Sequence, residues 1–109
     1  MSREKGNIAE QRGCTYLTEQ GYAVLERNFY SRFGEIDIIA SRGGVLCFIE
    51  VKSAQDYELA VQNLTPTKLG RFKRTVDVYI KKNNYSGDYE IDALLVMPDE
   101  IVHLQNITL

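Results

Sequence analysis

The sequence is poor in features that mark several common classes of protein. Its 109 residues include only two cysteines, Cys14 and Cys47, which lie in apolar segments and have no spacing typical of a metal site. We therefore expect two reduced, buried thiols and a cytoplasmic protein. No apolar run approaches the roughly 18 residues that span a membrane, and residues 1–10 are too polar for a signal peptide. These absences argue against export and against a membrane partner.

Basic residues are absent from residues 83–109, which hold five acidic residues, whereas all 13 Lys and Arg lie in residues 1–82. The net charge of −2 argues mildly against a nucleic-acid-binding protein. The segregation of charge is more informative than the total, because it leaves a net positive charge on residues 1–82.

Residues 36–40 and 45–52 read as two strands joined by a tight turn at residues 42–44, where a Gly-Gly pair suits positive φ angles. Both strands are rich in Ile, Val, Leu and Phe, which favours burial on both faces. They nevertheless contain Asp37, Glu50 and Lys52, and the last two share one strand face. A buried charge is costly unless it is paired, metal-bound or neutralised, so these three residues indicate a site or an ion-pair network.

Residues 7–20 are predicted to form a helix that ends at Gly21. At 100° per residue, Ala9, Cys14 and Leu17 lie on one apolar side, and Glu10 falls on the same side. Glu10 is either a carboxylate that belongs to a buried site or one at the rim of the stripe that reaches water or the helix N-terminus. The helix alone does not decide between them.

The segment Asn-Phe-Tyr-Ser-Arg-Phe at residues 28–33 follows a predicted strand at residues 22–28 and mixes aromatic side chains with Arg32; Arg27 precedes it. Such a mixture can stack on bases and contact phosphates. A loop whose aromatic residues cover the core is the commoner explanation.

A second helix is predicted at residues 66–82, with Thr65 as its N-cap and Pro66 at its first position. Opposite its apolar stripe lie five cations: Lys68, Arg71, Arg74, Lys81 and Lys82. This strip is either a nucleic-acid contact or a solvated helix face.

The rest of the chain completes an α/β domain. Residues 53–64 lack periodicity and are predicted to be a mobile connection, residues 83–88 a turn, and residues 89–97 and 101–104 the last two strands. His103 is expected to have a structural role. The resulting order predicts a central mixed sheet of about five strands flanked by helices.

The charged residues suit metal-assisted hydrolysis of phosphodiester bonds. This chemistry needs hard oxygen ligands for Mg²⁺ or Mn²⁺, a positioned water and a cation near the developing charge. Asp37 and Glu50 would supply oxygens, Lys52 the cation, and Glu10 would complete the set. The alternative without chemistry is a buried Glu50–Lys52 or Asp37–Lys52 ion pair.

Asp37 followed by Glu50-Val51-Lys52 resembles the core motif of the PD-(D/E)XK nuclease superfamily, although Ile36 stands where the superfamily name places Pro. Residues 5–12 look like the first helix of archaeal Holliday junction resolvases. The sequences YLTEQGYAVLERNF (16–29), GEIDIIA (34–40), FIEVK (48–52) and YEIDALLV (89–96) resemble those of the bacterial YraN-like family, which is considered endonuclease-like.

The resemblance implies a restriction-endonuclease-like three-layer fold, with residues 1–109 as one nuclease-like domain. It implies a Mg²⁺- or Mn²⁺-dependent endonuclease that cuts branched or flapped DNA, with no organic cofactor and with a homodimer as the active form. Its site residues, carried over by position, are Asp37, Glu50 and the Val51 carbonyl as metal ligands, Lys52 at the water, Glu10 beside the metal, Glu35 as an outer ligand and Lys68 on the nucleic-acid backbone.

Three functions remain open on the sequence. The first is the metal-dependent endonuclease, and the second is a nucleic-acid-binding protein with a vestigial site, whose binding weakens with salt but which cuts nothing. The third is a protein-interaction module in which the buried charges form a structural network.

Overall fold

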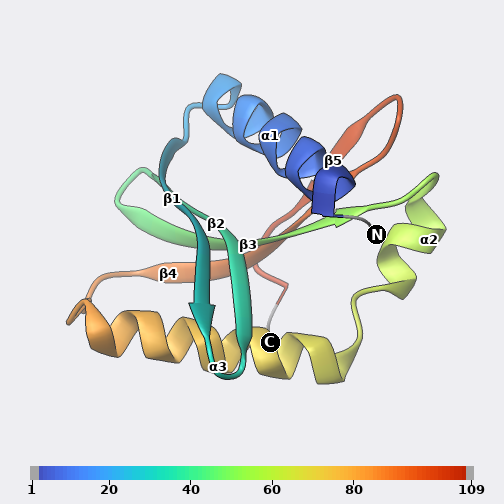
Figure 1. The fold of residues 1–109 in the computed structure, drawn as a ribbon. Coiled ribbons are helices and arrows are strands. Elements are labelled where there is room, and N and C mark those ends of the chain that lie inside the picture. Colours follow the sequence, from blue (N-terminus) through green and yellow to red (C-terminus); the bar gives the residue numbers. More distant parts are fainter. Residues whose placement is uncertain (1–2, 108–109) are drawn as a thin grey trace.

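The computed structural model describes residues 3–107 and contains one five-stranded sheet. Its elements, in chain order, are α1 (Arg3–Glu19), β1 (Ala23–Ser31), β2 (Gly34–Arg42), β3 (Val45–Ser53), α2 (Tyr57–Gln62), α3 (Pro66–Lys82), β4 (Tyr89–Val96) and β5 (Ile101–Leu104). The strands lie in the order β1-β2-β3-β4-β5, and only the β3–β4 pair is parallel (Figure 1). The crossover between these two strands contains α2 and α3, as a parallel connection requires.

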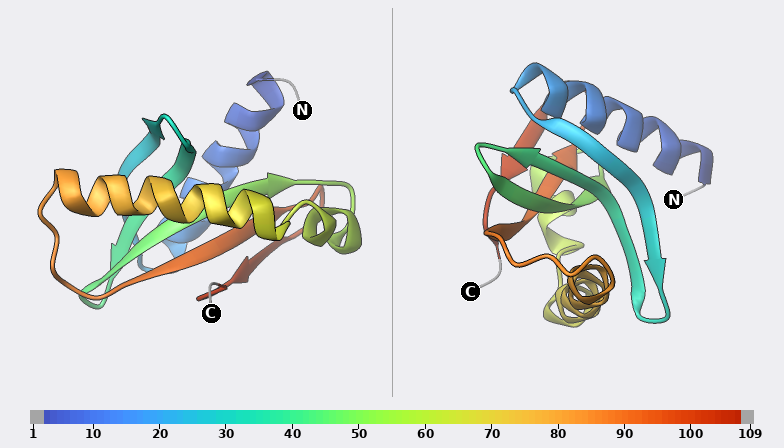
Figure 2. Two further views of the ribbon diagram at one scale, coloured as in Figure 1. Left: turned by 90° about the horizontal axis from the view of Figure 1, so that it is seen from below. Right: turned by 90° about the vertical axis from the view of Figure 1, so that its left-hand side faces the viewer.

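Strand β3 shows why the molecule has three layers. Cys47, Ile49 and Val51 pack in one apolar cluster with α1, whereas the alternate residues Leu46 and Phe48 pack in a second cluster with α3. The sheet is therefore covered by α1 on one face and by α3 on the other (Figure 2). The predicted α/β architecture, with a five-stranded mixed sheet between helices, is confirmed.

Close packing of α1 on the sheet depends on Gly13. A Cβ atom at this position would lie 2.8 Å from Cδ2 of Leu94 and 3.4 Å from Cδ1 of Ile38. The bare backbone therefore lets the helix approach β2 and β4 closely. Cys14 and Cys47 are both buried, free thiols in this layer, as predicted.

The far end of the β1–β2 hairpin leaves the sheet. The pairing of β1 with β2 continues to Ser31 and Gly34, but the pairing of β2 with β3 covers only Ile38 to Arg42. We call residues 29–36 the arm, and Figure 2 shows it extending beside α3. The arm is fixed there by a hydrogen bond between the hydroxyls of Ser31 and Thr75, 2.9 Å apart, and by burial of Phe29 and Ile36 against α3.

Two predicted boundaries were wrong. Residues 53–64 are not only a connection, because Asp56 caps the short helix α2 by accepting a hydrogen bond from the Leu59 N–H at 2.9 Å. This helix has six residues and buries only Ala60, so its sequence has too few turns for a periodic pattern. Residues 28–33 are not a loop, because β1 continues to Ser31 and the turn occupies residues 32–33.

The other predicted elements are confirmed to within a few residues. Helix α3 and strand β5 have the expected bounds, β4 ends one residue early, and α1 begins at Arg3 rather than at residue 7. Among the described residues, no helix combines the length and the apolar character needed to cross a membrane.

Candidate functional site

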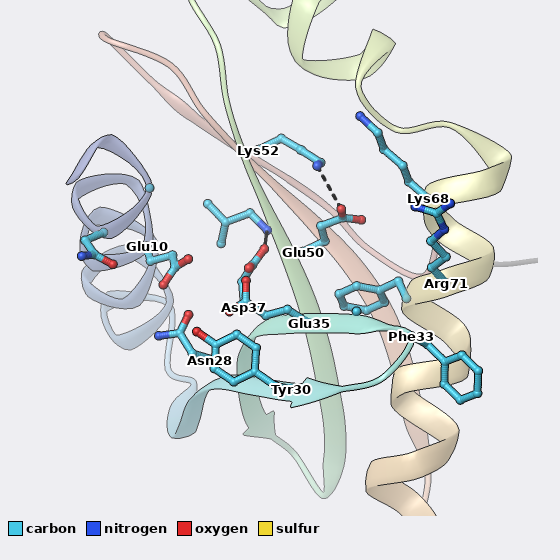
Figure 3. A pocket seen from close by; sticks show the side chains of 15 residues that line it. Glu10, Asn28, Tyr30, Phe33, Glu35, Asp37, Glu50, Lys52, Lys68 and Arg71 are labelled. Atoms are coloured by element: carbon cyan, nitrogen blue, oxygen red, sulfur yellow. Dashed lines mark hydrogen bonds and ion pairs between the residues drawn. The ribbon is translucent and has the colours of Figure 1, made fainter. Parts of the chain in front are cut away.

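A groove opens where the arm diverges from β3. Its volume is about 630 Å³. Figure 3 shows α1 on one side, the arm beside it, β3 as the floor and the first half of α3 on the opposite side. The charged residues that line it are Glu10, Glu35, Asp37, Glu50, Lys52, Lys68 and Arg71. All the acidic residues predicted for the site, together with Val51 and three predicted cations, thus come together in one groove.

Three carboxylates converge at the α1 side of the groove. Glu10, Glu35 and Asp37 each place one oxygen within 4.8 Å of the oxygens of the other two. We call this set the acid triad. Glu10 is only 9% exposed, so its position on the apolar side of α1 brings it into the site and not to solvent.

Without a metal ion, the carboxylates of the acid triad hold protons more tightly than free carboxylates do. Burial raises the pKa of Asp37 to about 8; the Val51 N–H, which donates to Asp37 Oδ2 at 2.7 Å, opposes this rise, and the neighbouring Glu35 and Glu10 add to it. Burial and the charge of Glu35 also raise the pKa of Glu10, although Arg27 counteracts them. Protons therefore neutralise part of the negative charge that the fold gathers here.

Two residues of β1 hold the acid triad. With its amide nitrogen facing the groove, Asn28 donates to Glu10 Oε1 at 3.0 Å and to Glu35 Oε2 at 3.3 Å. The opposite orientation would put the amide oxygen against two carboxylates. Asn28 adopts a left-handed φ of 56°, which Asn tolerates better than most residues. Arg27 Nη2 lies 3.5 Å from Glu10 Oε1 and its Nη1 donates to Gln11 at 3.2 Å.

Sequence reasoning missed Asn28 because it was placed at the junction of a strand and a loop. The available signal was the residue type, because Asn accepts left-handed backbone where most other residues are strained. Arg27, which the sequence analysis considered as a nucleic-acid contact, lies against Glu10 in the structure, and its contact with nucleic acid stays a prediction.

Glu50 and Lys52 lie on the floor of the groove, apart from the acid triad. Lys52 Nζ is 3.0 Å from Glu50 Oε1, so the ion pair considered from the sequence is present (Figure 3). The other oxygen, Glu50 Oε2, is buried and has no hydrogen-bond partner within the described part of the chain. Such an unsatisfied buried oxygen is costly, and a bound cation or donor would satisfy it.

The predicted nucleic-acid contacts divide into two groups. Lys68 and Arg71 line the groove from α3. Arg32 and Arg74 are not among the lining residues, and their guanidinium carbons lie 4.7 and 5.6 Å from the centre of the Phe33 ring at the tip of the arm. The α3 wall of the groove is therefore cationic and faces the acid triad on the α1 side.

A second group of acids, centred on the buried Asp92, joins β4 to β5 and the segment after it. The fully buried Asp92 has His103 Nε2 2.7 Å from its Oδ2 and accepts the Asn106 N–H on Oδ1 at 2.9 Å. Burial would raise the pKa of Asp92, but the hydrogen bonds from His103, Glu90 and Asn106 outweigh it and hold this pKa below its usual value. The hydrogen bond to Asp92, together with burial, raises the pKa of Glu90 to about 7.

We call Glu90, Asp92 and His103 the Asp92 network. Both oxygens of its buried carboxylate have partners from the chain itself. His103 therefore has a structural place, in line with the expectation from the sequence.

The residues of the groove fit a divalent cation such as Mg²⁺ or Mn²⁺. The donors are carboxylate oxygens, which these hard ions prefer. Glu50 Oε2 is a ligand atom without a partner among the described residues, and the raised pKa values of Asp37 and Glu10 indicate that too little positive charge faces the acid triad.

Fold and groove together define a class: α/β proteins with a five-stranded mixed sheet and an acidic groove beside its central strand. The sequence model described as "Uncharacterised protein family UPF0102" matches residues 9–96, and the chain belongs to this family. The matched stretch includes every candidate residue of the groove. The resemblance to the YraN-like family is confirmed at this level, whereas the nuclease superfamily stays a prediction.

Individual relatives are similar over all or nearly all of their length. A UPF0102 protein of Sulfurimonas denitrificans is 59% identical over 109 residues, which is all of both chains. A UPF0102 protein of Aliarcobacter butzleri is 50% identical over 110 residues, again covering both chains fully. A UPF0102 protein of Helicobacter pylori strain P12 is 44% identical over 106 residues, or 97% of this chain and 92% of the relative.

Proposed function

We propose that this chain is a divalent-metal-dependent nuclease that hydrolyses phosphodiester bonds in DNA. The observation that carries the proposal is the acid triad, whose oxygens lie within 4.8 Å of one another in a groove that also contains Lys52, Lys68 and Arg71. Carboxylates at this separation repel one another, and cations on the facing wall suit a polyanionic substrate.

The acid triad and Glu50 are the candidate ligands for Mg²⁺ or Mn²⁺. When bound, such an ion supplies Lewis-acid polarisation of the scissile phosphate and lowers the pKa of a water molecule. Asp37 is the central ligand in this proposal because it lies between α1 and β3 and is held by the Val51 N–H. The Val51 carbonyl, suggested by the family resemblance, stays a predicted further ligand.

The remaining residues bind and orient the reactants. Lys68 and Arg71 would hold backbone phosphates on the α3 wall. Lys52 would offset the charge that develops on the phosphate, or hold the attacking water, after it exchanges Glu50 for these partners. Arg27 and Asn28 keep the carboxylates of the acid triad together. A homodimer and a cytoplasmic location stay predictions.

The Lys52–Glu50 ion pair favours a second candidate function, a nucleic-acid-binding protein with a vestigial site. The ion pair joins Lys52 Nζ to Glu50 Oε1 at 3.0 Å, and hydrolysis would need both of these residues at the phosphate instead. In that case the groove would bind nucleic acid through Lys68 and Arg71 and cut nothing.

Cleavage assays separate the two candidates. Labelled four-way-junction, flap, single-stranded and duplex DNA would be incubated with the protein in Mg²⁺ or Mn²⁺, beside the Asp37→Asn and Lys52→Ala variants. If the chain is a nuclease, the wild-type protein should cut DNA and both variants should not. Both variants should still bind DNA in EDTA. Binding without cutting in either metal would instead select the vestigial site.

A further inference from the structure

Two guanidinium groups share one aromatic ring at the end of the arm. The guanidinium carbon of Arg32 lies 4.7 Å from the centre of the Phe33 ring, and that of Arg74, which belongs to α3, lies 5.6 Å from it. Figure 3 shows Phe33 at the end of the arm, next to α3. We call Arg32 and Arg74 the arginine pair. A cation–π contact stabilises each guanidinium over the ring, but it does not cancel the repulsion between two like charges.

The arginine pair has no counter-charge from the described part of the chain. Both side chains are exposed, and neither forms an ion pair with a carboxylate of the described residues. Residues 59–76, which include Arg74, contain no acidic residue. Two neighbouring cations without a counter-charge indicate a surface that binds an anion.

Hydrogen bonds hold the end of the arm against α3. The Phe33 N–H donates to Ser31 Oγ at 3.0 Å, and Ser31 Oγ lies 2.9 Å from Thr75 Oγ1. The hydroxyl of Thr75, which is fully buried, donates in turn to the Arg71 carbonyl at 3.2 Å. This chain of hydrogen bonds joins Phe33 to the turn of α3 that carries Arg71 and Arg74. The ring that orders the two guanidinium groups is therefore fixed relative to α3 before a ligand binds, which lowers the entropic cost of binding.

The arginine pair continues the cationic wall of the groove. Lys68, Arg71 and Arg74 follow one another at three-residue intervals on α3, so they form a stripe that extends about 9 Å along the helix. Phe33 itself lines the groove, so the arginine pair adjoins it. Successive phosphates of a duplex strand advance by about 3.4 Å along the axis, and the stripe is therefore long enough for about three of them.

We propose that the arginine pair binds backbone phosphates of the nucleic acid that occupies the groove, at a point beyond the groove. The inference rests on the proposed function, because it adds a second phosphate site to the same substrate-binding surface. The planar fork of a guanidinium suits phosphate oxygens, and phosphate contacts position a nucleic acid without reading its sequence. The strand then runs from the acid triad along α3 to the end of the arm. A substrate must extend past the groove to reach the arginine pair.

Fluorescence anisotropy in EDTA tests the inference without requiring hydrolysis. The labelled probes are DNA strands of about 4 and about 20 nucleotides, the longer sequence as a duplex, and poly-glutamate of similar length, each measured over a range of salt concentrations. The proteins are wild type, the double variant Arg32→Gln/Arg74→Gln, and Phe33→Leu. Glutamine removes the charge but keeps a planar head over the ring, so the arm should still fold. The matched control is Arg12→Gln/Lys73→Gln, which removes two cations from positions outside the groove and the arm.

The double variant should bind the long strand and the duplex about tenfold less tightly than wild type. Its slope of log affinity against log salt should fall by about 1.5, as expected when about two phosphate contacts are lost. Phe33→Leu should weaken binding but retain the slope, because the charges remain and are no longer ordered by the ring. The short strand should bind equally well to wild type and double variant. Binding of poly-glutamate should fall no further in the double variant than in the control.

An unchanged slope in the double variant, or an equal loss of DNA binding in the control, would overturn the inference. An equal loss for poly-glutamate would assign the arginine pair to acidic partners in general and would also overturn it. Failure of the inference can be told apart from failure of the proposed function. DNA binding that depends on the arginine pair, with no cutting in Mg²⁺ or Mn²⁺, would reject the hydrolysis and support the inference. Metal-dependent cutting by wild type, with DNA binding that the double variant retains in full, would do the reverse.

Discussion

The acid triad and the Asp92 network both contain buried carboxylates, but they differ in what neutralises the charge. In the Asp92 network His103 and the Asn106 N–H occupy both oxygens of Asp92. In the acid triad the cationic contact among the described residues is Arg27 to Glu10 at 3.5 Å, and the pKa of Asp37 is raised to about 8. Burial is common to both regions. The acid triad, whose negative charge is less well balanced by neighbouring residues, is therefore the candidate site for a bound cation.

The largest effect is expected when Asp92, the central carboxylate of the Asp92 network, is removed. Asp92→Ala leaves His103 and the Asn106 N–H without the carboxylate that both contact and removes a fully buried group, so the free energy of unfolding should fall by about 3 kcal/mol. Urea denaturation measures this change, and the Mn²⁺ response of the folded fraction should be retained. A loss below about 1 kcal/mol would mean that the network is not structural.

The carboxylates of Asp37 and Asp92 should respond to pH in opposite directions. Because the pKa of Asp37 is about 8 in the fold and 3.8 is its ordinary value, the folded state binds more protons between these values. Its contribution to stability is therefore lost as pH rises from about 4 to 8 in metal-free protein. The lowered pKa of Asp92 acts oppositely, since its stabilisation is lost only as pH falls below its usual range.

Unfolding measured from pH 4 to 9 in EDTA tests this sign. Asp37→Asn should remove most of the decline at high pH while retaining an acceptor for the Val51 N–H. Glu90→Gln is the comparison variant and should remove a smaller part of the decline, because the pKa of Glu90, raised to about 7, contributes to the same window from the Asp92 network. A decline that Asp37→Asn leaves intact would show that the acid triad is not its source.

A smaller effect, on metal affinity, is expected when Asn28, which holds the acid triad, is replaced. Asn28→Ala loses the amide that bridges Glu10 and Glu35, so affinity for Mn²⁺ should fall about tenfold, as for other residues that orient metal ligands. Isothermal titration measures it. Asn84→Ala is the control, since Asn84 has the same left-handed backbone, with φ of 49°, at an exposed position outside the groove. Equal loss in both variants would assign the effect to backbone strain.

The smallest effect concerns the cationic wall. Lys68→Ala and Arg71→Ala should each weaken DNA binding several-fold and reduce the slope of log affinity against log salt by about 1. Lys73→Ala, on an exposed part of α3 outside the groove, should leave the slope unchanged. The opposite pattern would remove this wall from the interface and leave the acid triad without a polyanionic substrate.

Most of the fold was predictable because its signals are local. Thr65 and Pro66 mark the start of α3, and the apolar runs of β2 and β3 mark buried strands. The six-residue α2 was missed because it is too short to show periodicity. The extension of β1 was missed because aromatic and basic residues at its end also suit a loop.

The site was predictable in its residues but not in its grouping. Glu10 stood out because it lies on an apolar helix face, and Asp37 and Glu50 because they lie in apolar strands. Which of these carboxylates lie close together depends on where the pairing of β2 with β3 stops, at Ile38 and Ile49. No local sequence pattern encodes that point. The divergence brings Asp37 to Glu10 and Glu35 and leaves Glu50 with Lys52.

Thermal melting with increasing Mn²⁺ tests most directly whether the acid triad is a metal site. At a concentration about 100 times the dissociation constant, binding adds about 2.7 kcal/mol to the stability of the fold, which corresponds to a rise in Tm of about 10 °C for a domain of this size. Wild type should show this rise, Asp37→Asn should not, and Glu90→Gln should behave as wild type. No rise in wild type at millimolar Mn²⁺, or an equal rise in Asp37→Asn, would contradict the assignment.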